Sequence, residues 1–195
     1  MDGFQRRREQ KENAILQAAL TLFMDAGVQK VSIAEIAAKA NVSQVTIYKY
    51  FESKENLTQL VLKFYVDQIW EEQKKQLNSD LPFLDKIKQI TFSKSDYANQ
   101  FNSQFFQYFM NDYSTGKSYV EEIYTREAIP RMIALFDEGK EQGFIDQNMS
   151  NEAILVYMQM FKDYLQQKDV SLTVLPMTED LITLFFYGIV GKKEE

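Results

Sequence analysis

Residues 31–57, VSIAEIAAKANVSQVTIYKYFESKENL, decide the fold, because local rules build two short helices joined by a tight turn from them. Ser32 opens an S-x-x-E capping box, so a helix is expected to begin at about Ile33. Asn41 ends it, since Asn enters the left-handed backbone region at low cost. Ser43 supplies the N-cap of the next helix. The stretch therefore predicts a tight helical corner.

The second helix of this corner, from Gln44 to about residue 50, has the character of a DNA-reading helix. Its first exposed residues suit the major groove, where Gln bonds an adenine edge and aliphatic groups touch a thymine methyl. Ile47 and Phe51, four residues apart, face back into the module. The side chains expected to hold phosphates are Tyr48, Lys49, Tyr50 and Lys54. The alternative is a helical hairpin inside a bundle, with its charges merely solvated.

The segment resembles the N-terminal domain of the TetR family of bacterial transcriptional regulators. The matching stretches are ALTLFMDAG (19–27), SIAEIAAKANVS (32–43) and TIYKYFESKENL (46–57). From this resemblance and the exposed face together, the expected DNA-contacting residues are Ser32, Ser43, Gln44, Val45, Thr46, Tyr48, Lys49, Tyr50 and Lys54. Many family members have a small residue in place of Val45 and His in place of Tyr50. The operator therefore cannot be taken from a relative.

Charge is distributed unevenly along the chain. Residues 1–63 hold nine Lys and Arg against seven Asp and Glu, whereas residues 64–195 hold 13 against 21. A protein with a pI near 4.9 binds nucleic acid non-specifically with modest, salt-sensitive affinity, so specificity must come from geometry. The basic run at residues 6–8, with Lys11, is either a mobile arm over DNA or the solvated start of the first helix.

Composition predicts an all-α protein with short connections. Of the 195 residues, 45% are hydrophobic and 14% aromatic, and Gly and Pro are scarce. We expect a three-helix helix-turn-helix domain over residues 1–53 and a helical bundle for ligand binding and dimerisation over residues 54–195. No apolar run approaches the ~20 residues that span a bilayer, and the N-terminus lacks a signal-peptide core. The expected location is the cytoplasm, with no membrane partner.

The chain contains neither Cys nor His. This excludes disulfides, the common zinc sites, a Ser-His-Asp triad and an imidazole base. We therefore expect no catalytic residues, no metal and no cofactor. An enzyme that works through paired carboxylates remains the formal alternative, distinguishable by turnover that is indifferent to loss of the helix-turn-helix.

Hydrophobic periodicity places the other helices. A first helix is expected over 9–26, stopped by Gly27, and a long helix over 54–77 follows an N-cap at Ser53. Pro130 should kink one of the later helices, and Gly143 should stop it. These later helices are expected over residues 80–93, from 95 or 96 to 113, 117–142, 151–167 and 178–190.

Aromatic residues between 97 and 113 fill one arc of a helical wheel that also includes Asp112. The arc is either ordinary core or the lining of a ligand cavity, and the family resemblance favours the cavity. Arg126 and Arg131, beside Pro130, either meet an anionic ligand or pair with nearby Glu residues. The candidate ligand-binding residues are Trp70, Phe101, Phe105, Tyr108, Asp112, Tyr124 and Arg131.

The last two helices are apolar over more surface than one partner helix covers, which favours a four-helix bundle between two copies of the chain. The alternative is a monomer that hides these faces internally. The expected interface residues are Ile154, Tyr157, Met158, Phe161, Leu165, Leu181, Phe185 and Ile189.

The expected function is a homodimeric transcriptional regulator, and the TetR resemblance implies a repressor. It would bind a palindromic double-stranded DNA operator and be released by a small apolar or aromatic inducer. A regulator controlled by a protein partner and a transcriptional activator are the alternatives.

Overall fold

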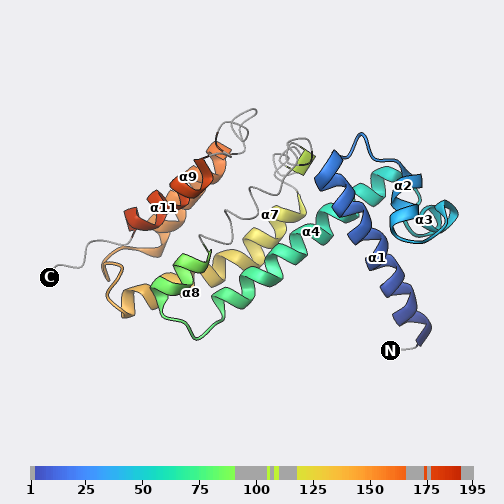
Figure 1. Ribbon diagram of the computed structural model, residues 1–195. Coiled ribbons are helices and arrows are strands. Elements are labelled where there is room, and N and C mark those ends of the chain that lie inside the picture. Colours follow the sequence, from blue (N-terminus) through green and yellow to red (C-terminus); the bar gives the residue numbers. More distant parts are fainter. Residues whose placement is uncertain are drawn as a thin grey trace. The chain divides into compact units, whose positions relative to one another are not determined.

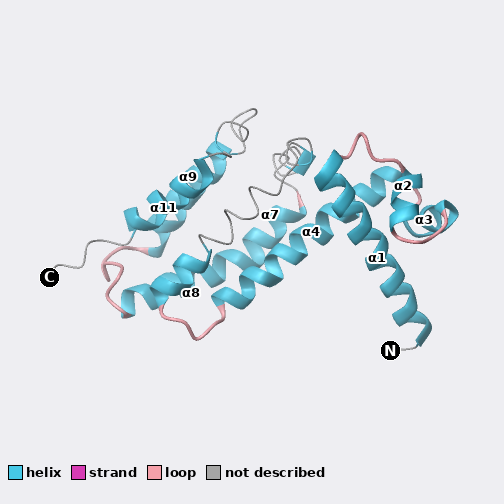
Figure 2. Ribbon diagram, viewed as in Figure 1, coloured by secondary structure: helices cyan, strands magenta, loops and turns pink. Residues whose placement is uncertain are grey.

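The computed structural model describes residues 3–90, 105, 108–109, 118–165, 174 and 177–189 (Figure 1). Every regular element in these ranges is helical (Figure 2). The helices are α1 (Gly3–Ala26), α2 (Ile33–Lys39), α3 (Gln44–Phe51), α4 (Lys54–Leu77), residues 83–90, α7 (Tyr119–Ile123), a π-helical turn (Tyr124–Ala128), α8 (Ile129–Glu141), α9 (Asn151–Leu165) and α11 (Thr178–Ile189). The all-α class is thus confirmed. Among these helices, none is both long and apolar enough to cross a membrane.

The chain forms two compact units, one from residues 1–69 and 101–109, the other from residues 70–100 and 110–195. Helix α4 contributes to both, because it runs without a break from residue 54 to residue 77. The expected domain boundary between residues 53 and 54 falls at the start of this helix and stays a prediction.

The core of the first unit is built where α1, α2, α3 and the first half of α4 meet. Phe23, Ile36 and Ile47 are each at most 1% exposed there. Ala37 is also buried, and its small side chain lets a neighbouring helix approach closely. Phe51 completes this core from the end of α3. The burial of Ile47 and Phe51 confirms the inward face expected for the second helix of the corner.

Helix α1 begins at Gly3, earlier than the expected residue 9. The intervening residues 3–8 are mostly Gln and Arg, straight-chain types that lose little rotamer freedom in a helix, so the helix extends through them. The basic run at residues 6–8 therefore lies within the first helix, exposed on its first turns, and its contact with DNA stays a prediction. At the other end Gly27 has φ +86°, the left-handed stop that the sequence predicts.

The core of the second unit lies around Phe83, Phe136 and Ile154, each at most 2% exposed. Phe83 comes from the helix over residues 83–90, and its ring stacks on Phe144 at 5.7 Å between centroids. Phe144 follows Gly143, which has φ +75° and ends the helix as expected.

Pro130 has the expected effect on its helix, but in a particular form. The preceding residues Tyr124–Ala128 are a π-helical turn, in which the N–H of Ile129 donates to the carbonyl of Tyr124, five residues back. Pro lacks an N–H and its ring crowds the carbonyl four residues earlier, so a wider turn relieves both problems. The kink expected near Pro130 is thus a local π-helix between α7 and α8.

Candidate nucleic-acid interface

The first helix of the corner is fixed by the capping box. The backbone N–H and the hydroxyl of Ser32 each donate to Glu35 Oε2 at 2.7 Å, and the Glu35 N–H donates to Ser32 Oγ at 3.2 Å. Asn41 has φ +53°, the left-handed conformation expected for the residue that ends this helix. The chain then turns at once into α3. The local rules that predicted the corner are confirmed by these contacts.

Helix α3 is capped by Ser43, whose Oγ accepts from the Thr46 N–H at 3.1 Å and contacts the Thr46 hydroxyl at 2.9 Å. Its inner face is buried, whereas Val45 is 76% exposed and Tyr48 is 50% exposed. Gln44 and Lys49 are exposed beside them. The exposed side chains of Val45 and Tyr48 on this short helix form a surface suited to contacting DNA.

The remaining expected DNA-contacting residues lie around this face. Tyr50 is half-buried, and the Arg8 guanidinium lies over its ring at 5.7 Å from the centroid. Lys54 is half-buried at the start of α4, close enough to Glu35 to act on its charge. Ser32 and Ser43 are exposed at the N-termini of α2 and α3. The first unit thus brings the expected set together, while their contact with DNA stays a prediction.

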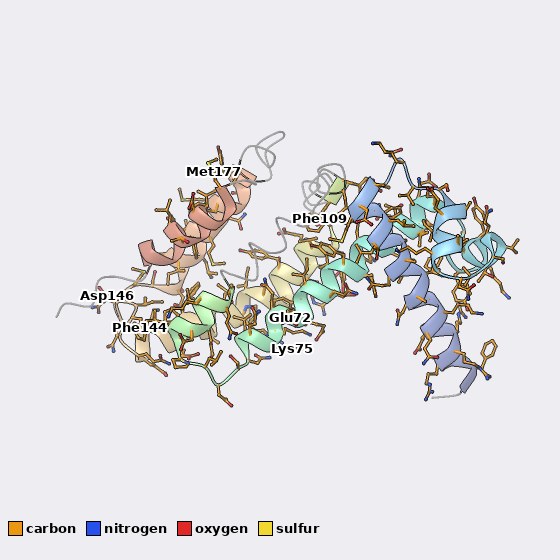
Figure 3. All side chains as sticks on the ribbon, viewed as in Figure 1. Glu72, Lys75, Phe109, Phe144, Asp146 and Met177 are labelled. Carbon is orange, nitrogen blue, oxygen red and sulfur yellow. The ribbon has the colours of Figure 1, made fainter. Side chains whose placement is uncertain are left out.

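Ion pairing differs sharply between the two units. In the second unit, seven Lys and Arg side chains each pair with a carboxylate; Lys75, for example, lies 3.7 Å from Glu72 (Figure 3). These paired residues are Lys74, Lys75, Lys86, Lys88, Arg126, Arg131 and Lys140. In the first unit, seven exposed cations form no ion pair with a carboxylate of the described residues: Arg6, Arg7, Arg8, Lys11, Lys30, Lys39 and Lys49.

Unpaired, exposed cations are the groups that displace counterions from DNA, because they neutralise phosphates without first losing a protein partner. Their concentration in the unit that contains the corner gives this acidic protein a local basic surface. The stack of Arg8 on Tyr50 belongs to this surface and was missed by the sequence reasoning. No sequence pattern could have found it, because the two residues are far apart in the chain.

Glu35 provides a titratable readout of the corner. Its pKa lies below the ordinary value of 4.5, chiefly because the side chain and then the backbone N–H of Ser32 donate to it, with attraction from Lys54 added. A lowered carboxyl pKa contributes stability that is present above the ordinary value and is lost as the pH falls through the lowered one.

We therefore expect α2 to loosen at its first turn as the pH falls below the ordinary carboxyl pKa of 4.5 and through the lowered pKa of Glu35. Glu35→Gln should remove this transition and keep the cap, since Gln also serves in a capping box. Amide NMR shifts of residues 32–35 measure it. An unchanged transition in Glu35→Gln would assign the titration to another group.

The candidate ligand-binding residues do not form one group. Phe105 is fully buried in the core of the first unit, edge-on to Tyr65 at 5.8 Å, and Tyr108 packs against the same core. Trp70 belongs to the second unit, where the Arg131 guanidinium lies 5.5 Å from its ring centroid. Phe101 and Asp112 lie outside the described residues.

The polar candidates in the second unit are two ion-paired arginines, the buried indole N–H of Trp70 and the hydroxyl of Tyr124. Arg131 pairs with Glu127 at 2.9 Å and Arg126 with Glu122 at 2.6 Å, which is the ion-pair alternative of the sequence reasoning. Trp70 itself is 8% exposed, and its Nε1 has no hydrogen-bond partner among the described residues. Burial, with Glu121 and Asp163 adding repulsion, raises the pKa of the half-buried Tyr124.

The expected interface residues of α9 and α11 pack largely within the chain. Ile154 is 2% exposed in the core of the second unit. The ring of Tyr157 stacks on Phe185 at 5.3 Å, and Phe161 meets both rings edge-on. Met158 and Leu181 are half-buried. Leu165 and Ile189 are the last residues of α9 and α11.

A different apolar surface of α9 and α11 is exposed. Val156 is 62%, Met160 63% and Tyr164 50% exposed, and Leu184 of α11 is 64% exposed. The sequence reasoning missed this stripe, although the four-residue spacing along α9 was a usable signal. Exposed apolar side chains repeated on one helix face are typical of a surface that a partner covers.

The capped helices α2 and α3, with the exposed face of α3, form a helix-turn-helix of the kind that many DNA-binding proteins use. Residues 15–61 match the family model described as bacterial regulatory proteins, tetR family. The match spans α2, α3 and the start of α4, so this part of the chain is similar to the DNA-binding domain of that family.

Two curated relatives and one solved structure illustrate the similarity. The activator FasR of Mycolicibacterium smegmatis is 27% identical over 108 residues, covering 55% of this chain and 49% of the relative. The repressor KstR2 of the same organism is 27% identical over 77 residues, covering 40% and 38%. The chain thus spans less than half the length of these curated relatives. A crystal structure of a γ-butyrolactone receptor, an ArpA-like protein, has a TM-score of 0.60 at 18% identity, covering 94% of this chain and 90% of that one, which supports the fold alone.

Proposed function

We propose that this protein is a TetR-family repressor that binds a palindromic DNA operator as a homodimer and is released by a small-molecule ligand. The observation that carries DNA binding is the exposed face of α3, where Gln44, Val45 and Tyr48 stand in water above a buried inner face. In this position Gln44 and Val45 would read base edges, while Tyr48, Lys49, Tyr50 and Lys54 hold the flanking phosphates.

Ligand control rests on two features. Helix α4 contributes residues to both units, so a change in the second unit has a continuous helix through which to act on the first. The unpartnered Nε1 of buried Trp70 is a donor that an acceptor atom of an apolar or aromatic ligand would satisfy. Such a ligand releases DNA only as far as it prefers the released state over the bound one.

The direct test is selection of binding sites from fragmented genomic DNA of the source at near-physiological salt, followed by mapping of the protected bases. A short palindrome is the expected result, and no enrichment over non-specific binding would contradict the proposal. Transcription from the selected site with and without the protein then gives the direction of control. An increase on adding the protein would favour the activator alternative, for which the relative FasR gives a precedent.

Homodimer formation is expected to involve the exposed stripe of α9. Met160→Glu places a charge in the middle of the stripe, and burying it unpaired costs about 3–5 kcal/mol, so the dimer dissociation constant should rise at least a hundredfold. Sedimentation equilibrium measures this. The matched control is Gln147→Glu, which adds the same charge at an exposed loop position. A dimer unaffected by Met160→Glu would move the interface elsewhere.

A further inference from the structure

A basic cleft of about 450 Å³ lies in the first unit between the start of α1 and the end of α3. Its lining consists of four cations and two aromatic rings: Phe4, Arg7, Arg8, Lys11, Lys49 and Tyr50. None of these side chains is acidic. We call this feature the α1–α3 cleft.

The α1 wall of the cleft is one face of a helix. Its four residues follow the spacing i, i+3, i+4 and i+7, which places them above one another on consecutive turns. Because α1 is helical from Gly3, the three cations of this wall, Arg7, Arg8 and Lys11, lie on one side of the helix. The Arg8 guanidinium is positioned over the Tyr50 ring at 5.7 Å, which joins this wall to α3.

The charge of the cleft is uncompensated. Arg7, Arg8, Lys11 and Lys49 are all exposed, and none pairs with a carboxylate of the described residues. Four like charges gathered around one concave surface repel one another, and an anion that enters relieves this repulsion. The occupant suited to the cleft is therefore polyanionic.

The position of the cleft selects among polyanions. Lys49 and Tyr50 belong to the same helix that presents Gln44 and Val45 to base edges. A duplex read by the first turn of α3 carries its own phosphates past the last turn. The cations of α1 line the same cleft as Lys49 and Tyr50, within reach of those phosphates.

We propose that the α1–α3 cleft binds the DNA backbone flanking the base pairs read by α3, so that α1 lengthens the contact with the operator. This inference rests on the proposed function. The cations of α1 add affinity and salt dependence without sequence preference, because phosphates are alike at every base step. Sequence preference is still determined by the exposed face of α3.

The test compares Arg7→Gln/Lys11→Gln with the intact chain on the selected operator. Each phosphate contact adds about 0.9 to the slope of log affinity against log salt, so the slope should fall by about 1.8 per bound chain. Between 50 and 200 mM salt, the intact chain should thus lose about tenfold more affinity per bound chain than the variant. Gln preserves helix propensity, and the helical circular dichroism should not change.

The matched control is Lys75→Gln/Lys88→Gln. It removes the same charge from the second unit, where both residues form exposed pairs of the kind that contribute little to stability. Its salt slope should stay within error of that of the intact chain, apart from the small long-range effect of net charge. An equal fall in slope for both double variants would assign the effect to net charge and overturn the cleft.

Shortening the DNA gives an independent readout. Base pairs are removed from both ends of the operator until only the bases protected most strongly by α3 remain. The shortening should weaken the intact chain and leave Arg7→Gln/Lys11→Gln almost unchanged, because the variant has already lost the flanking contact. If the intact chain and the variant lose equal affinity on the shortened operator, the cleft does not bind flanking DNA. Operator selection by the intact chain would then still support the proposed function. An intact chain that binds no DNA would overturn both.

Discussion

Tyr48→Ala/Lys49→Ala should abolish measurable operator binding and leave the fold intact. Tyr48 is 50% exposed and Lys49 is exposed, and neither accepts or donates a side-chain hydrogen bond within the described residues. Surface substitutions of this kind change stability by about 0.5 kcal/mol or less. Each lost DNA contact costs about 1–3 kcal/mol, so the pair should cost at least about 2 kcal/mol, or about thirtyfold in affinity, per bound chain.

The measurement is titration of the selected operator and of a scrambled duplex of the same length, with helical content checked in parallel. Affinity should fall for both duplexes, because the phosphate contacts expected of Tyr48 and Lys49 do not depend on base sequence. Lys75→Ala/Lys88→Ala is the control for removing exposed side chains elsewhere. Undiminished operator binding would show that Tyr48 and Lys49 of α3 do not contact DNA.

The corner could be predicted from sequence because each of its steps is local. The capping box, the left-handed Asn41 and the N-cap at Ser43 depend on residues no more than three positions apart. Ile47 and Phe51 then face inward because a four-residue spacing places them on one side of the helix. These rules position the expected DNA-contacting residues without any knowledge of the rest of the chain.

Features that depend on distant residues could not be predicted. The stack of Arg8 on Tyr50 requires α1 to extend past its expected start and to cross the end of α3. On α9, periodicity found an apolar helix, but the choice of Tyr157 and Phe161 over Val156 and Met160 as the packed face depends on α11. An apolar helix side has no local mark that distinguishes a core contact from an exposed stripe.

Gly139→Ala should destabilise the second unit, although Ala is the better helix former. A Cβ at residue 139 would lie 2.8 Å from Phe83 and 3.0 Å from Ile145. Phe83 cannot move aside easily, because it is 1% exposed and stacked on Phe144. Overpacking of this kind costs about 1–3 kcal/mol, which outweighs or cancels the helix gain of about 1 kcal/mol.

Gly188→Ala is the matched control, since its Cβ would meet only the hydroxyl of Tyr157 at 3.8 Å, an ordinary contact. It should stabilise α11 by up to about 1 kcal/mol. Because both changes add the same methyl group to a helix, the difference between the two free energies of unfolding isolates the clash, about 1–3 kcal/mol. Urea unfolding followed by Trp70 fluorescence reports it, since the only Trp of the chain lies in the second unit. Equal effects of the two substitutions would mean that the Phe83 ring yields, and that close packing at Gly139 does not hold α8 against the helix over residues 83–90.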